Sequence, residues 1–87
     1  MVYEQLKIIE HYGYKHQLNK LIEELRELEA VIINEPDNTD HIQEEIADVL
    51  NLIEQIIIYN GWYPQICEIE NFKIGRQLSR IELENQQ

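Results

Sequence analysis

Apolar residues recur at spacings of three and four along most of the 87-residue chain, which is the period of an amphipathic α-helix. Three breaks interrupt this pattern: Gly13, the polar segment 34–40, and the segment 61–64, which contains a glycine and a proline. The pattern therefore predicts one short and three long helices, over about 2–12, 15–33, 40–60 and 64–84.

The short breaks between the helices determine the predicted architecture. Four helices with short connections predict an all-α fold, an antiparallel four-helix bundle, and 87 residues fit a single domain spanning 1–87. Asp40, followed by Gln43 three residues later, resembles a capping box at the start of the third helix. Pro64 suits the first turn of the fourth.

The long helices carry more apolar surface than so small a bundle can bury. Between residues 42 and 57, the third helix is apolar over a wide arc of its circumference. The second helix has an apolar stripe made of Leu18, Leu21, Ile22, Leu25, Leu28 and Ile32. We therefore predict that the bundle is completed by oligomerisation, as a homodimer or a higher homo-oligomer.

Charge and cysteine content narrow the classes of partner. The chain has 17 acidic and 7 basic residues, a formal net charge of −10, which argues against nucleic acid and anionic membranes as partners. No apolar run approaches the length of about 18 residues needed for a membrane span, and the first 13 residues lack the pattern of a signal peptide. Cys67 is the single cysteine, so no internal disulfide forms. These features predict a cytoplasmic protein.

Two carboxylates occupy unusual positions on the third helix. With Ile42 set at zero, the apolar arc runs from about 280° through zero to about 80°. Glu45 falls at about 300°, inside this arc, and Asp48 at about 240°, at its edge. A carboxylate within an apolar stripe is costly unless it is paired or binds a cation. Glu45 and Asp48 are therefore candidate metal ligands.

The second helix carries a matching pair. Glu24 and Glu27 are three residues apart and share one face beside the apolar stripe. Two facing pairs on antiparallel helices would gather four hard oxygen donors, which suit Mg²⁺ or Mn²⁺ rather than zinc or copper. The alternative is an ordinary solvated acidic face. None of the three histidines has a glutamate three residues before it, so the Glu-x-x-His motif of di-iron bundles is absent, and we expect these histidines at the surface or in packing.

The fourth helix carries three of the seven cations. Lys73, Arg76 and Arg80 are spaced three and four apart and form one stripe. They would either clamp a polyphosphate held on the metals or form ordinary salt bridges. Trp62, in the break before this helix, would either stack on a nucleobase or pack in the core or an interface.

Together these motifs resemble the MazG-like all-α nucleoside triphosphate pyrophosphohydrolases. The resemblance rests on Glu23-Glu24-x-x-Glu27, on Glu44-Glu45-x-x-Asp48, and on the basic run 72–81 of the last helix, which is similar to short, phage-type members. It covers roughly residues 12–82 and implies hydrolysis of a nucleoside triphosphate, often a deoxynucleotide, to the monophosphate and pyrophosphate.

The resemblance also implies roles for individual residues. Glu24, Glu27, Glu45 and Asp48 would coordinate Mg²⁺, and Asn51 would contact the nucleotide although the helical wheel turns it away from the apolar arc. The residues expected to contact substrate are Lys73, Arg76, Arg80, Asn51, Lys20 and Trp62.

The chemistry of the reaction suggests a further role for the second helix. Glu24 or Glu27 would orient or deprotonate the attacking water. The competing hypothesis is a non-catalytic helical interaction or regulatory module, whose apolar faces bind a partner helix.

Overall fold

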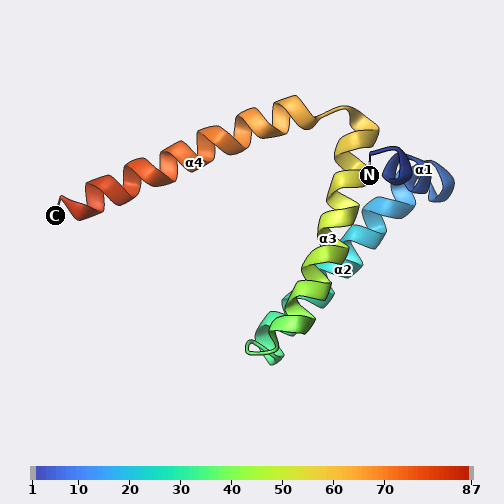
Figure 1. Cartoon of the computed structure of the whole chain (residues 1–87), viewed down its shortest axis with the longest axis horizontal. Helices are drawn as coiled ribbons and strands as arrows, with labels where there is room; N and C mark the ends of the chain where they lie inside the picture. The colour runs from blue at the N-terminus through green and yellow to red at the C-terminus, as the bar shows by residue number, and fades with distance from the viewer. Residues whose placement is uncertain (1, 87) are drawn as a thin grey trace.

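The structure is a computed structural model that describes residues 2–86, and over this range the chain forms four α-helices and no strand (Figure 1). The helices are α1 (Val2–Tyr12), α2 (Tyr14–Asn34), α3 (Thr39–Asn60) and α4 (Tyr63–Asn85). The predicted all-α class, with one short and three long helices, is confirmed, and each boundary lies within one residue of the prediction. The end residues of the predicted domain, Met1 and Gln87, lie outside the described residues.

Two glycines and one asparagine set the ends of the helices. Gly13 and Gly61 have φ values of 96° and 66°, which side-chain-bearing residues rarely adopt, so the chain can turn within one or two residues. Asn38 caps α3, because its side-chain oxygen accepts a hydrogen bond from the backbone N–H of His41 at 3.1 Å. The predicted cap at Asp40 is therefore wrong, since α3 already begins at Thr39.

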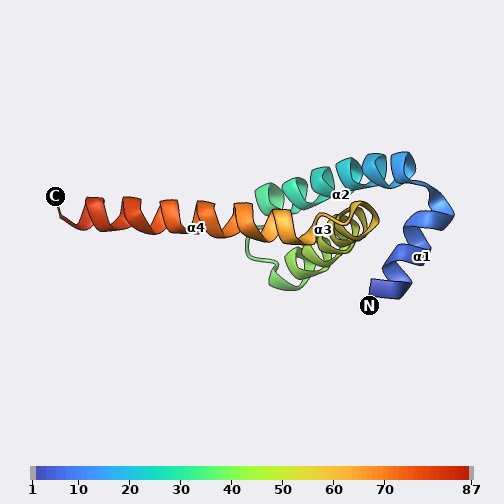
Figure 2. The same cartoon turned by 90° about the horizontal axis from the view of Figure 1, so that it is seen from above.

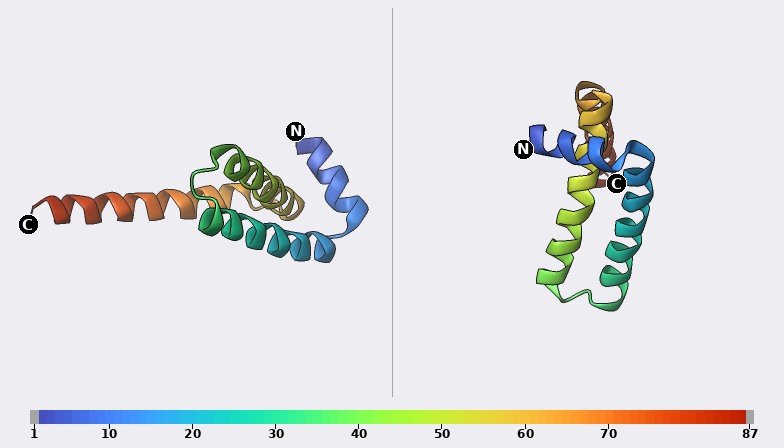
Figure 3. Two further views of the ribbon diagram at one scale, coloured as in Figure 1. Left: turned by 90° about the horizontal axis from the view of Figure 1, so that it is seen from below. Right: turned by 90° about the vertical axis from the view of Figure 1, so that its right-hand side faces the viewer.

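The first three helices pack together. α2 and α3 form an antiparallel hairpin in contact along its length, and α1 crosses its open end and packs mainly on α3 (Figure 3). The buried apolar residues of the described chain are Ile9, Val31, Val49 and Leu52. Two glutamines join this core: Gln17 on α2 donates a buried hydrogen bond to Gln55 on α3 at 2.9 Å.

The fourth helix projects away from this three-helix unit (Figures 1 and 2). Only Gly61 and Trp62 separate it from α3, and none of its residues is buried. The radius of gyration is 16.4 Å, whereas a compact chain of this length would have about 12 Å. The place of a fourth bundle helix is thus not filled by α4 of the same chain.

α2 also faces α3 with a different side than its apolar stripe indicated. The residues buried on α2 are Gln17, Glu24 and Val31, whereas Leu25 and Ile22 are 46% and 47% exposed. The apolar arc of α2 is wider than one helix–helix contact, so packing on α3 can bury only one edge of it.

Among residues 2–86, no helix has both the length and the apolar content to cross a bilayer.

Candidate metal centre

Three carboxylates from the two long helices of the hairpin converge. Glu24 and Glu27 on α2 and Glu45 on α3 each place one oxygen within 4.8 Å of the others. Oxygens around one Mg²⁺ are separated by roughly 3–4 Å, because each lies about 2.1 Å from the ion. The cluster is therefore close to the spacing that a divalent cation requires, and three of the four predicted metal ligands do lie together.

The two most enclosed carboxylates have the same arrangement of partners. Glu24 Oε1 lies 3.8 Å from Lys20 Nζ, and Glu45 Oε1 lies 3.4 Å from His41 Nε2. The second oxygen of each, Oε2, is buried without a hydrogen-bond partner. A buried carboxylate oxygen without a partner costs free energy. A cation bound between the two helices would remove this cost, so the donor set fits a hard divalent ion.

The electrostatics of Glu24 follow from this enclosure. Burial raises the pKa of Glu24 above its usual value of 4.5, and the nearby carboxylates of Glu27 and Asp48 raise it further. Lys20 acts in the opposite direction, but more weakly. Repulsion among these carboxylates is a second feature typical of a cation site, after the unpartnered oxygens. A bound divalent ion would lower the pKa of Glu24, because it attracts the charged form.

Asp48, the fourth predicted ligand, lies at the edge of the cluster. It is exposed to solvent, yet it is close enough to raise the pKa of Glu24, and both residues line the same cavity of about 210 Å³. This cavity lies between α1, α2 and α3, and its wall consists of Ile8, Gln17, Lys20, Glu24, Asp48, Asn51, Leu52 and Gln55. We call it the acidic cavity.

Two further predicted residues lie in the wall of the acidic cavity. Lys20 adds a cation beside Glu24. Asn51 lies there as well, and its side-chain oxygen accepts hydrogen bonds from Gln5 at 3.2 Å and from Gln55 at 3.3 Å. The helical wheel turned Asn51 away from the apolar arc, and it is exposed, but α1 packs on that side of α3 and contacts it through Gln5.

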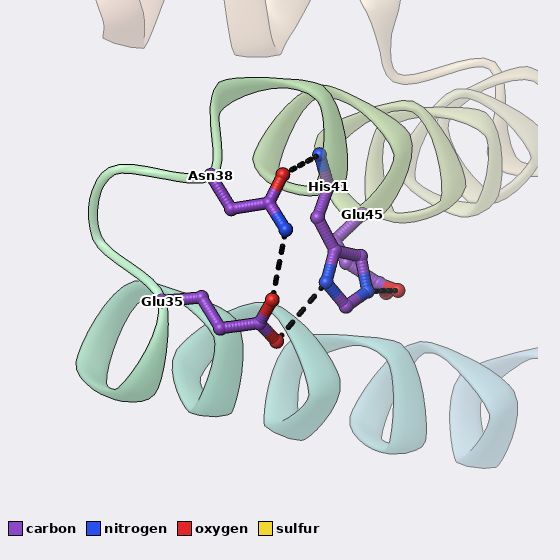
Figure 4. A network of polar contacts seen from close by, with 4 residues as sticks. All are labelled: Glu35, Asn38, His41 and Glu45. Atoms are coloured by element: carbon purple, nitrogen blue, oxygen red, sulfur yellow. Dashed lines mark hydrogen bonds and ion pairs between the residues drawn. The ribbon is translucent and has the colours of Figure 1, made fainter.

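His41 has a role that the sequence did not indicate. Figure 4 shows its ring between Glu35 at the end of α2 and Glu45 on α3, with distances of 3.1 Å from Nδ1 and 3.4 Å from Nε2. Its hydrogen bond with Glu35 raises the pKa of His41. Asn38 also donates to Glu35, at 2.9 Å, and with His41 lowers the pKa of Glu35. His41 lies at the surface, as expected, but it also links the hairpin turn to a cluster carboxylate.

A second cavity adjoins the acidic cavity. It has a volume of about 370 Å³, is lined by Tyr12, His16, Gln17, Lys20 and Glu23, and shares Gln17 and Lys20 with the acidic cavity. The rings of Tyr12 and His16 are stacked, with centroids 5.3 Å apart and planes 18° apart. The sequence analysis assigned no ligand contact to either residue. Their stacking depends on the turn at Gly13, which brings the end of α1 next to the start of α2.

The remaining predicted residues are not brought to the cluster within one chain. Lys73, Arg76 and Arg80 are exposed on α4, which projects away from the three-helix unit (Figure 1). Trp62 lies in the connection before α4 and is 44% exposed. None of these four residues lines the acidic cavity.

No known protein family, curated protein or solved structure matches this chain.

Proposed function

We propose that this chain is a Mg²⁺-dependent nucleoside triphosphate pyrophosphohydrolase, which converts a nucleoside or deoxynucleoside triphosphate to the monophosphate and pyrophosphate. The observation that carries the proposal is the pair of unpartnered, buried carboxylate oxygens on Glu24 and Glu45, two members of one acidic cluster. The resemblance of the two motifs to MazG-like enzymes supplies the reaction.

The residues that would hold Mg²⁺, or Mn²⁺ in its place, are Glu24, Glu27, Glu45 and Asp48. When bound, the ion neutralises charge on the triphosphate and lowers the pKa of water. Water attacks the α-phosphorus, the bond to the bridging oxygen breaks, and pyrophosphate leaves. Glu24 or Glu27 would orient the water and accept its proton.

The surroundings of the cluster support a nucleotide as the ligand. Lys20 lies between the two adjoining cavities, where a cation would contact a phosphate group. The stacked rings of Tyr12 and His16 offer aromatic surface for a base, and Asn51 offers an amide. Lys73, Arg76, Arg80 and Trp62 are not part of the proposed site, because none of them lines either of the two cavities.

The direct test is pyrophosphate release from a panel of ribo- and deoxynucleoside triphosphates with Mg²⁺. We expect release from at least one of them, and kcat/KM at least about 100-fold lower in Glu45→Gln, since even an indirect partner of a metal ligand is worth 10–100-fold. Glu44→Gln is the matched control, because it removes the same charge from the exposed neighbouring position. A well-folded protein that releases no pyrophosphate from any substrate would contradict the proposal.

Metal binding can be tested without turnover. We expect the melting temperature to rise with free Mg²⁺, because a ligand that binds only the folded state stabilises it. The rise should disappear in Asp48→Ala and persist in Glu44→Gln. Melting temperatures that do not respond to Mg²⁺ or Mn²⁺ would leave the second candidate, a non-catalytic helical interaction module, which the exposed apolar residues of α2, α3 and α4 favour.

The setting follows from the proposed reaction. We place the protein in the cytoplasm, where nucleoside triphosphates are held, acting on a small substrate and not on nucleic acid or a membrane. We further propose that it works as a homodimer or a higher homo-oligomer.

A further inference from the structure

An apolar surface covers one side of the α2–α3 hairpin. Its members are aliphatic residues that are each 36–51% exposed, and we call them the outer face: Leu18, Ile22, Leu25, Ile32, Ile46, Leu50 and Ile53. The largest apolar patch on a typical monomer is about 300–600 Å² and is often functional. Seven half-exposed Leu and Ile side chains on two adjacent helices form a patch of this order, so the outer face is a candidate binding surface.

The outer face and the acidic cavity lie on opposite sides of the hairpin. Glu24 on α2 and Leu52 on α3 are buried between the two helices. Measured from them, the outer-face residues lie about 80–160° around each helix in one direction, whereas Asp48, Asn51 and Lys20 lie about 40–100° in the other. In an antiparallel pair, residues displaced in the same rotational direction around their own helix axes lie on the same side of the hairpin. A partner on the outer face therefore leaves the acidic cavity open.

α4 offers a surface that matches the outer face. One third of its circumference, about 120°, carries a stripe made of Ile66, Cys67, Ile74, Leu78 and Ile81, which Glu70 and Gln77 interrupt. All five are left uncovered by the same chain, apart from the half-buried Cys67. The chain thus contains both halves of an interface, an apolar face and an amphipathic helix, and neither half has a partner within the chain.

Charge favours α4, rather than a second hairpin, as the element that covers the outer face. Of the 17 acidic and 7 basic residues, α4 carries four and three, which leaves 13 and four on the rest of the chain. Two hairpins packed face to face would bring together two strongly acidic bodies. The part of α4 from 66 to 81 has three cations and only two acids, so it is attracted to an acidic hairpin.

The exposed area of the chain matches the size of an obligate interface. The chain exposes 7065 Å², whereas a folded monomer of 10.5 kDa would expose about 5,400 Å². The excess of about 1,600 Å² per chain exceeds the roughly 800 Å² per partner of a standard interface and falls in the range of permanent dimers.

We propose that α4 of a second copy of this chain lies across the outer face, so that two copies exchange their α4 helices in a reciprocal, two-fold dimer. Each copy contributes one helix and one face, which is the self-complementary arrangement of a two-fold interface. Each three-helix unit then packs against α4 of the second copy, which takes the place of a fourth bundle helix. The dimer stands independently of the proposed activity, because it uses the side of the hairpin opposite the acidic cavity.

The test is the mass of the full-length protein in solution, measured by light scattering and sedimentation equilibrium. We expect a dimer at micromolar concentration, and monomers for Leu50→Lys on the outer face and for Ile74→Lys on the α4 stripe. Ala47→Lys is the matched control, since it adds the same charge to an exposed position of α3 outside the outer face, and it should remain dimeric. Far-ultraviolet circular dichroism would establish that each variant is helical.

Several results would overturn this proposal. A wild-type chain that is monomeric in solution would overturn it. In that case, either α4 folds back on its own hairpin or the outer face binds a different protein. A dimer that survives Ile74→Lys would remove α4 from the interface. If Leu50→Lys does not fold, Leu50→Ala should raise the dimer dissociation constant at least about tenfold, and an unchanged constant would count against the proposal. The two proposals fail separately, because monomeric protein that releases pyrophosphate overturns only the dimer.

Discussion

α2 and α4 are alike in length, with 21 and 23 residues, and both combine an apolar stripe with charged positions, but the chain uses them differently. α2 packs on α3 and buries Glu24 there, which raises the pKa of that carboxyl and leaves one of its oxygens without a partner. α4 has no buried residue, and Lys73 and Arg76 remain exposed on it. An amphipathic pattern predicts that a helix packs on a partner. Burial against a particular partner is what shifts the pKa of a charged residue and removes its hydrogen-bond partners.

The largest expected difference between the two helical regions is in packing energy. Leu52→Ala in the core of the three-helix unit should lower the free energy of unfolding by about 2–5 kcal/mol, because it removes a buried side chain and leaves a cavity. Leu83→Ala on α4 is the matched substitution at a residue that is 62% exposed and lies off the α4 stripe, and its effect should stay within about 0.5 kcal/mol. Urea unfolding measures both. Equal losses would show that α4 packs as tightly as the bundle.

A smaller effect concerns the cost of the cluster itself. In the presence of EDTA, Glu24→Leu should raise the free energy of unfolding by about 1–3 kcal/mol, because it removes a buried carboxylate oxygen that has no partner. The same variant should lose the stabilisation by Mg²⁺. Thermal melts with EDTA and with Mg²⁺ would measure both effects. A less stable Glu24→Leu protein would indicate that Lys20 already compensates the buried charge.

The smallest expected effect is the dependence of stability on pH. Because the pKa of Glu24 is raised above 4.5 in the folded chain, the folded state binds more protons than the unfolded state between pH 4.5 and the raised value. Without metal, stability should therefore fall as pH rises through this window. Glu24→Gln should make the slope shallower, whereas Arg76→Gln on α4 should leave it unchanged. Unfolding measured from acid to neutral pH in EDTA checks this, and equal slopes in the wild type and Glu24→Gln would contradict it.

Mg²⁺ should change the sign of this dependence. The carboxylates must be deprotonated to bind the ion, so the gain in melting temperature from Mg²⁺ should grow with pH over the same window. A gain that does not vary with pH would indicate binding elsewhere on the acidic surface.

Much of the candidate site could be predicted from local spacing. The i, i+3 spacing of Glu24 and Glu27 and the position of Glu45 within an apolar arc depend only on helix geometry, and the structure brings these three carboxylates together. His41, Gln17 and Gln55 could not be found in this way, because their partners lie six or 38 residues away in the sequence. The contact between Asn51 and Gln5 depends on α1, whose position over α3 has no local signal.

The sequence by itself determined the four helices, their limits and the pairs of carboxylates, because helix period, glycine breaks and i, i+3 spacing are local properties. Only the tertiary structure decided which edge of the broad apolar arc of α2 is buried, and that α4 leaves the unit that the other three helices form. The physical reason is that hydrophobic burial is non-directional: a wide apolar arc can be buried against several partners, and the choice among them depends on contacts between distant segments.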